Sequence, residues 1–185
     1  DSERVPSWGS DEESGMCTTA APELVFSAVG KQIKDARVLG VPAVNTTVAN
    51  LATWALRTFQ CDVQKVLGIC TKKSAPLSSS NPKYVCAIAN NMARCLSYVE
   101  ELRESVTLDV EERARVRIEE EFEDVLDGFR WSSSIAVDDL CAGVEKELAT
   151  LTMRFFDART GTEVMLDVIE ILSEFFSRYE MWLMP

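Results

Sequence analysis

The chain has 185 residues, of which 46% are hydrophobic, and its 30 acidic and 19 basic residues give a net charge of −11. This apolar content supports a folded core and excludes an intrinsically disordered chain. The negative charge argues against nucleic acid or an anionic membrane as the main partner, because both bind basic surfaces. No uncharged apolar run of about eighteen residues occurs, so the sequence contains no candidate membrane-spanning helix.

The first twenty residues differ in composition from the rest of the chain. Residues 1–18 are rich in Asp, Glu, Ser and Gly, which is typical of a segment without a packed core. We therefore expect residues 1–20 to be a disordered acidic tail or loop remnant, and residues 21–185 to form one helical domain. The chain begins without Met and has no signal peptide, so we interpret it as a segment of a longer protein.

Two helices are predicted in residues 22–38 and 46–71, where apolar residues recur at three- and four-residue steps. Gly40 and Pro42 are expected to end the first helix, and Asn45 is the predicted N-cap of the second. The residues of the second helix that are expected to face the core are Val48, Leu51, Ala52, Ala55, Phe59, Val63, Val66, Leu67 and Cys70. A loop rich in Ser, Pro and Lys follows.

The longest apolar stripe lies in residues 84–106, which we predict to be the central helix of the fold. Pro82 suits the first helical position because proline lacks the N–H that this position leaves unbonded, and Asn81 is a good N-cap. The neighbouring helices are expected to pack along this helix. The residues predicted at the centre of the core are Ile88, Met92, Leu96 and Val99.

Asp109 is predicted to cap the next helix. At residues 131–134 (Trp-Ser-Ser-Ser) this helix either restarts or continues with a kink, because serine both caps helices and occurs inside long ones. A turn at residues 157–161 precedes the last helix, whose expected inward face is Met165, Val168, Ile169, Leu172, Phe175, Phe176, Tyr179 and Trp182. The predicted fold class is all-α, an elongated antiparallel bundle of about five to six long helices joined by short loops.

The residues that most catalytic and metal sites need are missing from the sequence. It contains no histidine, which removes Ser-His-Asp and Cys-His catalysis and the common zinc and di-iron sites. It also lacks a Walker phosphate loop and a GxGxxG motif. The six cysteines include no CxxC pair, the spacing typical of zinc and redox sites. Four of them lie on or near apolar helical stripes, and a chain with a large core needs no disulfides, so we expect core cysteines in a reducing, cytosolic compartment. We therefore predict no catalytic residue, no cofactor, no metal and no disulfide.

Asn90 and Asn91 are the polar exception in the central stripe. A buried amide that bonds to a neighbouring helix can fix the register between the two helices. Alternatively, both side chains lie at the edge of the stripe and are hydrated. If at least one is buried, we expect its partner to lie on an adjacent helix, because an unsatisfied buried amide costs about 1–3 kcal/mol.

Residues 84–91 read YVCAIANN, which resembles the pattern in the middle of the Sec-six subunit of the exocyst (exocyst component three). Residues 140–156 and 164–176 are similar to two helices that follow in that family. The resemblance implies a rod of consecutive helical bundles. It also implies a non-enzymatic scaffold that tethers secretory vesicles to the plasma membrane before SNARE-mediated fusion. The implied partners are other exocyst subunits and SNARE-class proteins, and the implied location is the cytoplasm, with recruitment to sites of secretion at the plasma membrane.

Two alternatives stay open from the sequence. One is a segment of a MUN-type vesicle-priming factor, which carries a similar apolar-Asn-Asn helix. The other is a helical bundle that binds a small molecule or acts as an enzyme, which would need a pocket of several hundred Å³ with convergent polar groups. At the end of the chain, Met181, Leu183 and Met184 cannot all share the inward face of one helix. We expect them to form an inter-domain contact.

Overall fold

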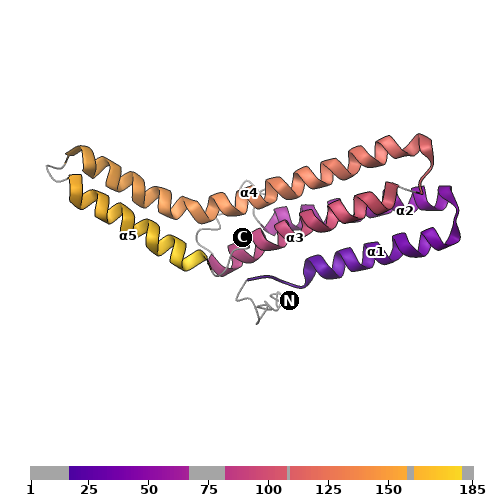
Figure 1. Ribbon diagram of the computed structural model, residues 1–185, viewed down its shortest axis with the longest axis horizontal. Coiled ribbons are helices and arrows are strands. Elements are labelled where there is room, and N and C mark those ends of the chain that lie inside the picture. The colour runs from indigo at the N-terminus through magenta and orange to yellow at the C-terminus, as the bar shows by residue number, and fades with distance from the viewer. Residues whose placement is uncertain (1–16, 67–81, 108, 158–160, 181–185) are drawn as a thin grey trace.

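In the computed structural model, which describes residues 17–66, 82–107, 109–157 and 161–180, the chain is elongated and helical (Figure 1). The described residues form five helices and no β-strand. This arrangement confirms the predicted all-α fold. The helices are α1 (Ala21–Leu39), α2 (Pro42–Val66), α3 (Pro82–Thr107), α4 (Glu112–Asp157) and α5 (Gly161–Tyr179).

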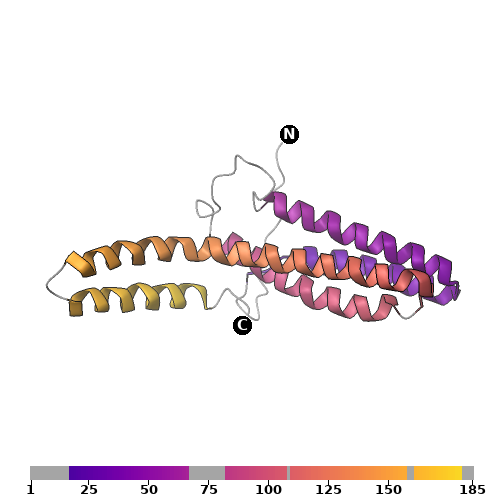
Figure 2. The ribbon, with the colours of Figure 1, turned by 90° about the horizontal axis from the view of Figure 1, so that it is seen from above.

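The helices form two regions that differ in the number of neighbours each helix has. We call α1, α2, α3 and the first part of α4 the bundle, because these four segments lie side by side (Figures 1 and 2). We call the rest of α4 together with α5 the arm, which extends from one end of the bundle. Within the bundle, α3 makes its most extensive packing with α4.

Aromatic rings mark the centre of the bundle. Phe129 of α4 is fully buried and lies 6.4 Å from the ring of Phe26 on α1 and 6.2 Å from the ring of Phe59 on α2, measured between ring centroids. Side chains of α1, α2 and α4 therefore meet at Phe129. Other fully buried side chains of the same core are Leu56, Val85, Met92, Val99, Ile118, Phe122, Val125 and Leu126.

The start of α2 differs from the prediction. The helix begins at Pro42 and not at Thr46, because proline fits the first turn of a helix, where no N–H is required. Gly40 ends α1 with a φ of 64°, a conformation that glycine adopts without strain. Asn45 is therefore inside α2, where its buried side chain donates a hydrogen bond to the carbonyl of Asp109 at 3.0 Å.

The start of α4 also requires a correction. Asp109 is not the helix cap, since α4 begins at Glu112. The carboxylate of Asp109 instead accepts a hydrogen bond from Nε of Arg37 on α1 at 2.6 Å. The backbone N–H of Glu111 donates to the hydroxyl of Thr46 on α2 at 3.0 Å. These polar contacts attach the segment before α4 to the end of the bundle where α1 and α2 meet.

The helix α4 continues through residues 131–134 and spans 46 residues without interruption, a length of about 69 Å at ~1.5 Å per residue. Ser132 is buried, and its hydroxyl donates to the carbonyl of Gly128 at 2.8 Å. Such a bond satisfies a serine inside a helix and often bends the helix slightly. Figure 1 shows that α4 bends in its middle part, where it passes from the bundle to the arm. Of the two alternatives left by the sequence, the structure has the continuous helix.

Candidate functional site

The predicted centre of α3 is buried at three of its four positions. Ile88, Met92 and Val99 lie in the core of the bundle. Leu96 is only partly buried and packs at the edge of this core. Cys95, which is fully buried, takes the central position instead. The stripe of α3 is therefore rotated slightly from the face that the sequence indicated.

Both asparagines of α3 are buried, with exposed fractions of 2% for Asn90 and 7% for Asn91. The Asn90 amide donates to the carbonyl of Cys17 at 2.8 Å. Asn91 donates to the Thr19 hydroxyl at 2.8 Å and accepts from the Thr19 backbone N–H at 3.0 Å. These bonds join both asparagines to the segment before α1, and not to the adjacent helix that was expected.

The reason is that residues 17–20 precede α1 and are not helical. The Cys17 carbonyl and the Thr19 N–H can therefore bond with side chains, whereas a helix uses its own backbone groups internally. The two asparagines thus bind this segment against α3. Because residues 17–20 are held in this way, they belong to the folded part of the chain and not to the expected tail. Residues 1–16 lie outside the described part of the structure.

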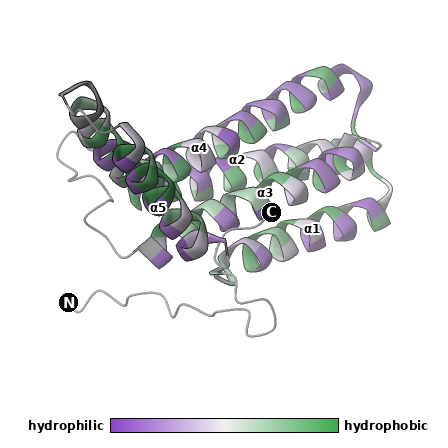
Figure 3. Cartoon of the chain, turned by 60° about the vertical axis from the view of Figure 1, so that its left-hand side comes forward, coloured by the Kyte–Doolittle hydropathy of each residue, from purple (hydrophilic) through white to green (hydrophobic). Residues whose placement is uncertain are grey.

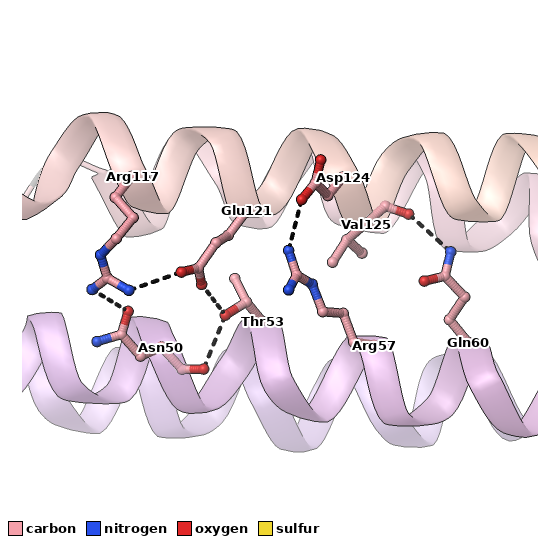
Figure 4. Close-up of polar contacts among 8 residues, drawn as sticks. All are labelled: Asn50, Thr53, Arg57, Gln60, Arg117, Glu121, Asp124 and Val125. Carbon is pink, nitrogen blue, oxygen red and sulfur yellow. Dashed lines mark hydrogen bonds and ion pairs between the residues drawn. The ribbon is translucent and has the colours of Figure 1, made fainter.

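A second row of polar contacts joins α2 to α4 (Figure 4). Along α2 the contributing residues recur at three- and four-residue steps, so their side chains share one face of the helix. Arg117 donates to the Asn50 side-chain oxygen at 3.0 Å, and the Thr53 hydroxyl donates to Glu121 at 2.9 Å. Arg57 donates to Asp124 at 2.9 Å, and the Gln60 amide donates to the carbonyl of Val125 at 3.4 Å.

This row was not predicted from the sequence, because only the structure shows which polar residues of α2 are buried. Thr53 and Gln60 are buried polar residues on the same side of α2, and each needs a partner because a buried unpaired group is costly. Gly128 of α4 makes room for Gln60, since a Cβ at that position would lie 1.6 Å from the Gln60 side-chain nitrogen. The partners could not be assigned beforehand because they are more than sixty residues away in the chain.

The cysteines of α3 are shielded from solvent. Burial raises the pKa of the Cys86 and Cys95 thiols to about 12 in each case. A thiol with so high a pKa is protonated at neutral pH and is a poor nucleophile and metal ligand. In the described part of the chain, no group of three or more His, Cys, Asp or Glu side chains is arranged to hold a metal ion.

Two surface grooves flank α1. The groove between α1 and α3 has a volume of about 700 Å³ and an opening to solvent. Charges of both signs line it, and one of them, Glu23, forms an ion pair with Arg94 at 3.0 Å. The groove between α1 and α2 has a volume of about 340 Å³ and is lined almost wholly by apolar side chains. Leu51, which was expected to face the core, lines this second groove and is exposed.

The arm exposes an apolar stripe along α5. Val164 and Tyr179 are buried, whereas Met165, Ile169 and Phe176 are exposed, contrary to the inward face predicted for them. With the half-buried Leu172 they follow four-, three- and four-residue steps, which places them on one side of the helix. Figure 3 shows green, apolar stretches along α5. Met181, Leu183 and Met184 lie outside the described residues.

The comparison with protein families decides the identity of this helical chain. The sequence profile described as "Exocyst complex component Sec6" matches residues 2–185. The chain belongs to the Sec6 family of exocyst components. This assignment confirms the resemblance that residues 84–91 carry. No curated protein matches the sequence.

One solved structure supports the fold of this Sec6 chain. The crystal structure of the C-terminal domain of the exocyst subunit Sec6p aligns with a TM-score of 0.67 and 14% sequence identity. The alignment covers 98% of the present chain and 49% of the solved one, so the Sec6 chain spans about half the length of that domain. No helix in the described part of the Sec6 chain combines the length and apolar character needed to cross a bilayer.

Proposed function

We propose that this Sec6 chain is part of a non-enzymatic scaffold subunit that tethers secretory vesicles to the plasma membrane before SNARE-mediated fusion. The observation that carries the proposal is the match of the exocyst Sec6 family to residues 2–185. The shape agrees with a scaffold role, because an elongated helical body can hold partners apart at a fixed spacing (Figure 2). The exposed apolar surfaces on α1, α2 and α5 are of the kind that proteins use to bind other helices.

The proposed partners are the other exocyst subunits and, through the assembled complex, proteins of the SNARE class. The proposed location is the cytoplasm, with recruitment to sites of secretion at the plasma membrane. The chain carries the acidic charge noted above, so its contacts are expected to be with proteins and not with the anionic membrane itself.

The test uses the full-length protein in its own cell, tagged for purification and for rapid depletion. We expect other exocyst subunits to purify with it, and secretory vesicles to accumulate beneath the plasma membrane after depletion. A wild-type copy should restore secretion, and so should a copy with Val116→Ala, since Val116 is exposed on α4. A copy with Phe129→Ala, which opens a cavity at the centre of the bundle, should not restore it. Normal secretion after depletion, with no exocyst subunit in the purified sample, would contradict the proposal.

We further propose that Met181, Leu183 and Met184 belong to an inter-domain contact in the longer protein. The support for this proposal is that the neighbouring stripe of α5, which includes Ile169 and Phe176, is exposed. Hydrogen exchange of α5 and residues 181–184 should be slower in the full-length protein than in the 185-residue segment. Equal exchange rates in the two proteins would show that these residues form no such contact.

A further inference from the structure

The core of the bundle is built mainly by α3 and α4. We call residues 17–66, which contain α1 and α2, the α1–α2 hairpin. Among the largest fully buried side chains of the described residues, Leu56, Thr53 and Pro22 come from this hairpin, and one of these three is polar. Those that come from α3 and α4 are Val85, Asn90, Met92, Val99, Ile118, Phe122, Val125, Leu126 and Phe129. The hairpin therefore covers a core that is supplied largely by its two neighbours.

Polar side chains occupy much of the face that α2 turns towards the bundle. The polar residues buried on α2 are Asn45, Thr46, Thr53 and Gln60, beside Ala49, Ala52 and Leu56. An apolar side chain loses its hydrophobic stabilisation when it enters water, whereas a polar one exchanges its protein partner for water at a small net cost. Separation of α2 from α4 therefore costs less free energy than separation of two apolar faces of the same size.

Hydrogen bonds and ion pairs fasten the hairpin to the rest of the bundle at both ends and along one side. Near the turn between α1 and α2, Arg37 bonds to Asp109 at 2.6 Å. Near the start of α1, Glu23 pairs with Arg94 of α3 at 3.0 Å, and the segment before α1 bonds to the two asparagines of α3. The polar row between α2 and α4 runs along the side (Figure 4). Water can replace each of these partners once the hairpin has moved away.

The two helices of the hairpin are held to each other in a different way. A link of two residues, Gly40 and Val41, joins them. The side chains that line the groove between them are apolar except for Gln32, so pulling α1 away from α2 would expose apolar surface to water. The chain then continues from α2 to α3 through residues 67–81. The two helices are therefore expected to move together.

We propose that the α1–α2 hairpin opens from the bundle as one unit while α3 and α4 stay paired. Opening breaks the polar contacts named above and uncovers the apolar face of α3 and α4. This face includes Phe129, whose ring lies beside Phe26 and Phe59 of the closed hairpin. The hairpin is thus a cover built into the fold, and its position decides whether this face is hidden. The movement belongs to the chain itself and does not depend on the tethering role.

Hydrogen exchange of the full-length protein in a series of low urea concentrations tests the proposal. A part of a protein that opens alone has its own free energy of opening, shared by its slowest amides, and a urea slope set by the surface that it exposes. The slowest amides of α1 and α2 should share one such free energy and one slope. Both quantities should be lower than those of α3, and without urea these amides should exchange about tenfold faster than the slowest amides of α3.

A substitution on α2 tests whether α1 opens with it. Gln60→Ala removes a buried side chain that bonds to α4 and fills the space above Gly128. Without urea, it should speed exchange in α2 by about fivefold, and in α1 by the same factor, although residue 60 is not part of α1. Thr58→Ala is the matched control, because the exposed Thr58 hydroxyl bonds only to the carbonyl of Trp54 in its own helix. Its effect on exchange should stay below about twofold.

Thermal melting checks that each variant is folded. If Gln60→Ala does not fold, Arg57→Ala takes its place, since it removes only an exposed ion pair with Asp124. It should speed exchange in α1 and α2 by one common, smaller factor.

Three results would overturn the proposal. If α1, α2 and α3 share one free energy of opening and one urea slope, the hairpin opens only when the whole bundle unfolds. If α1 and α2 differ from each other in these quantities, they do not form one unit. If the substitution on α2 speeds exchange there and leaves α1 unchanged, α2 opens without α1.

Discussion

The bundle and the arm use the same kind of helix but cover it differently. In the bundle, α3 packs against α1, α2 and α4, whereas α5 in the arm has α4 as its main neighbour. The consequence is clearest in two phenylalanines, since Phe129 is fully buried and Phe176 is 64% exposed. Amphipathic periodicity gives each of these helices an apolar face, but the number of neighbouring helices decides how much of that face is buried.

The largest expected effect comes from changing these two phenylalanines in the same way. Phe129→Ala should lower the free energy of unfolding by about 3–5 kcal/mol, because it leaves a cavity where three helices meet. Phe176→Ala should change it by less than about 0.5 kcal/mol, since most of this ring is already in water. Urea unfolding of the 185-residue chain measures both values. Similar losses for the two variants would show that the arm is as tightly covered as the bundle.

A smaller effect is expected from the amide that binds the segment before α1. Asn91→Ala removes two hydrogen bonds to Thr19 and should lower the free energy of unfolding by about 1–3 kcal/mol. It should also speed hydrogen exchange at the backbone N–H of Thr19. Asn50→Ala is the matched control, because its bond to Arg117 is exposed and should contribute less than about 1 kcal/mol. An unchanged exchange rate at Thr19 would mean that this segment is held by other contacts.

The smallest effect at neutral pH belongs to the buried thiols of the bundle. The pKa of Cys95 rises from 9.0 to about 12 in the folded chain, so above pH 9 the unfolded chain loses its thiol proton before the folded chain does. Proton loss then favours unfolding, and stability should fall as the pH rises from about 9 towards 12. Unfolding curves across this range, compared with those of Cys95→Ala, test this. The variant should show a weaker dependence on pH, and an identical dependence would exclude this thiol as a cause.

The sequence predicted the parts of the fold that depend on local pattern. The spacing of Ile88, Met92 and Val99 places α3 correctly in the core, because helical periodicity is a property of neighbouring residues. Pro42 was misassigned because proline both disfavours the continuation of a helix and suits the first position of one, and here it begins α2. The role of Ser132 could not be decided from the sequence, because a serine hydroxyl can either cap a new helix or bond to the preceding turn of a continuous one.

Features that depend on residues far apart in the chain could not be predicted from the sequence, for a physical reason. The bond between Asn91 and Thr19 joins residues 72 positions apart, and no local pattern specifies such a pair. The exposure of Leu51 and Phe176 was missed because an apolar face shows that burial is favourable, not that a neighbour is present. The groove between α1 and α2 shows the same effect, since its lining includes Val48, Leu51 and Ala55, which the sequence had placed inside.

The unbroken course of α4 has a mechanical consequence. A loop between the bundle and the arm would act as a pivot, but one helix runs through both regions. To swing the arm, the chain must bend this helix and weaken the hydrogen bonds along one side of it. The arm therefore holds a nearly constant direction relative to the bundle. A force applied to the arm is transmitted along the axis of α4 to the helices packed around Phe129, because α4 joins the two regions without a flexible linker.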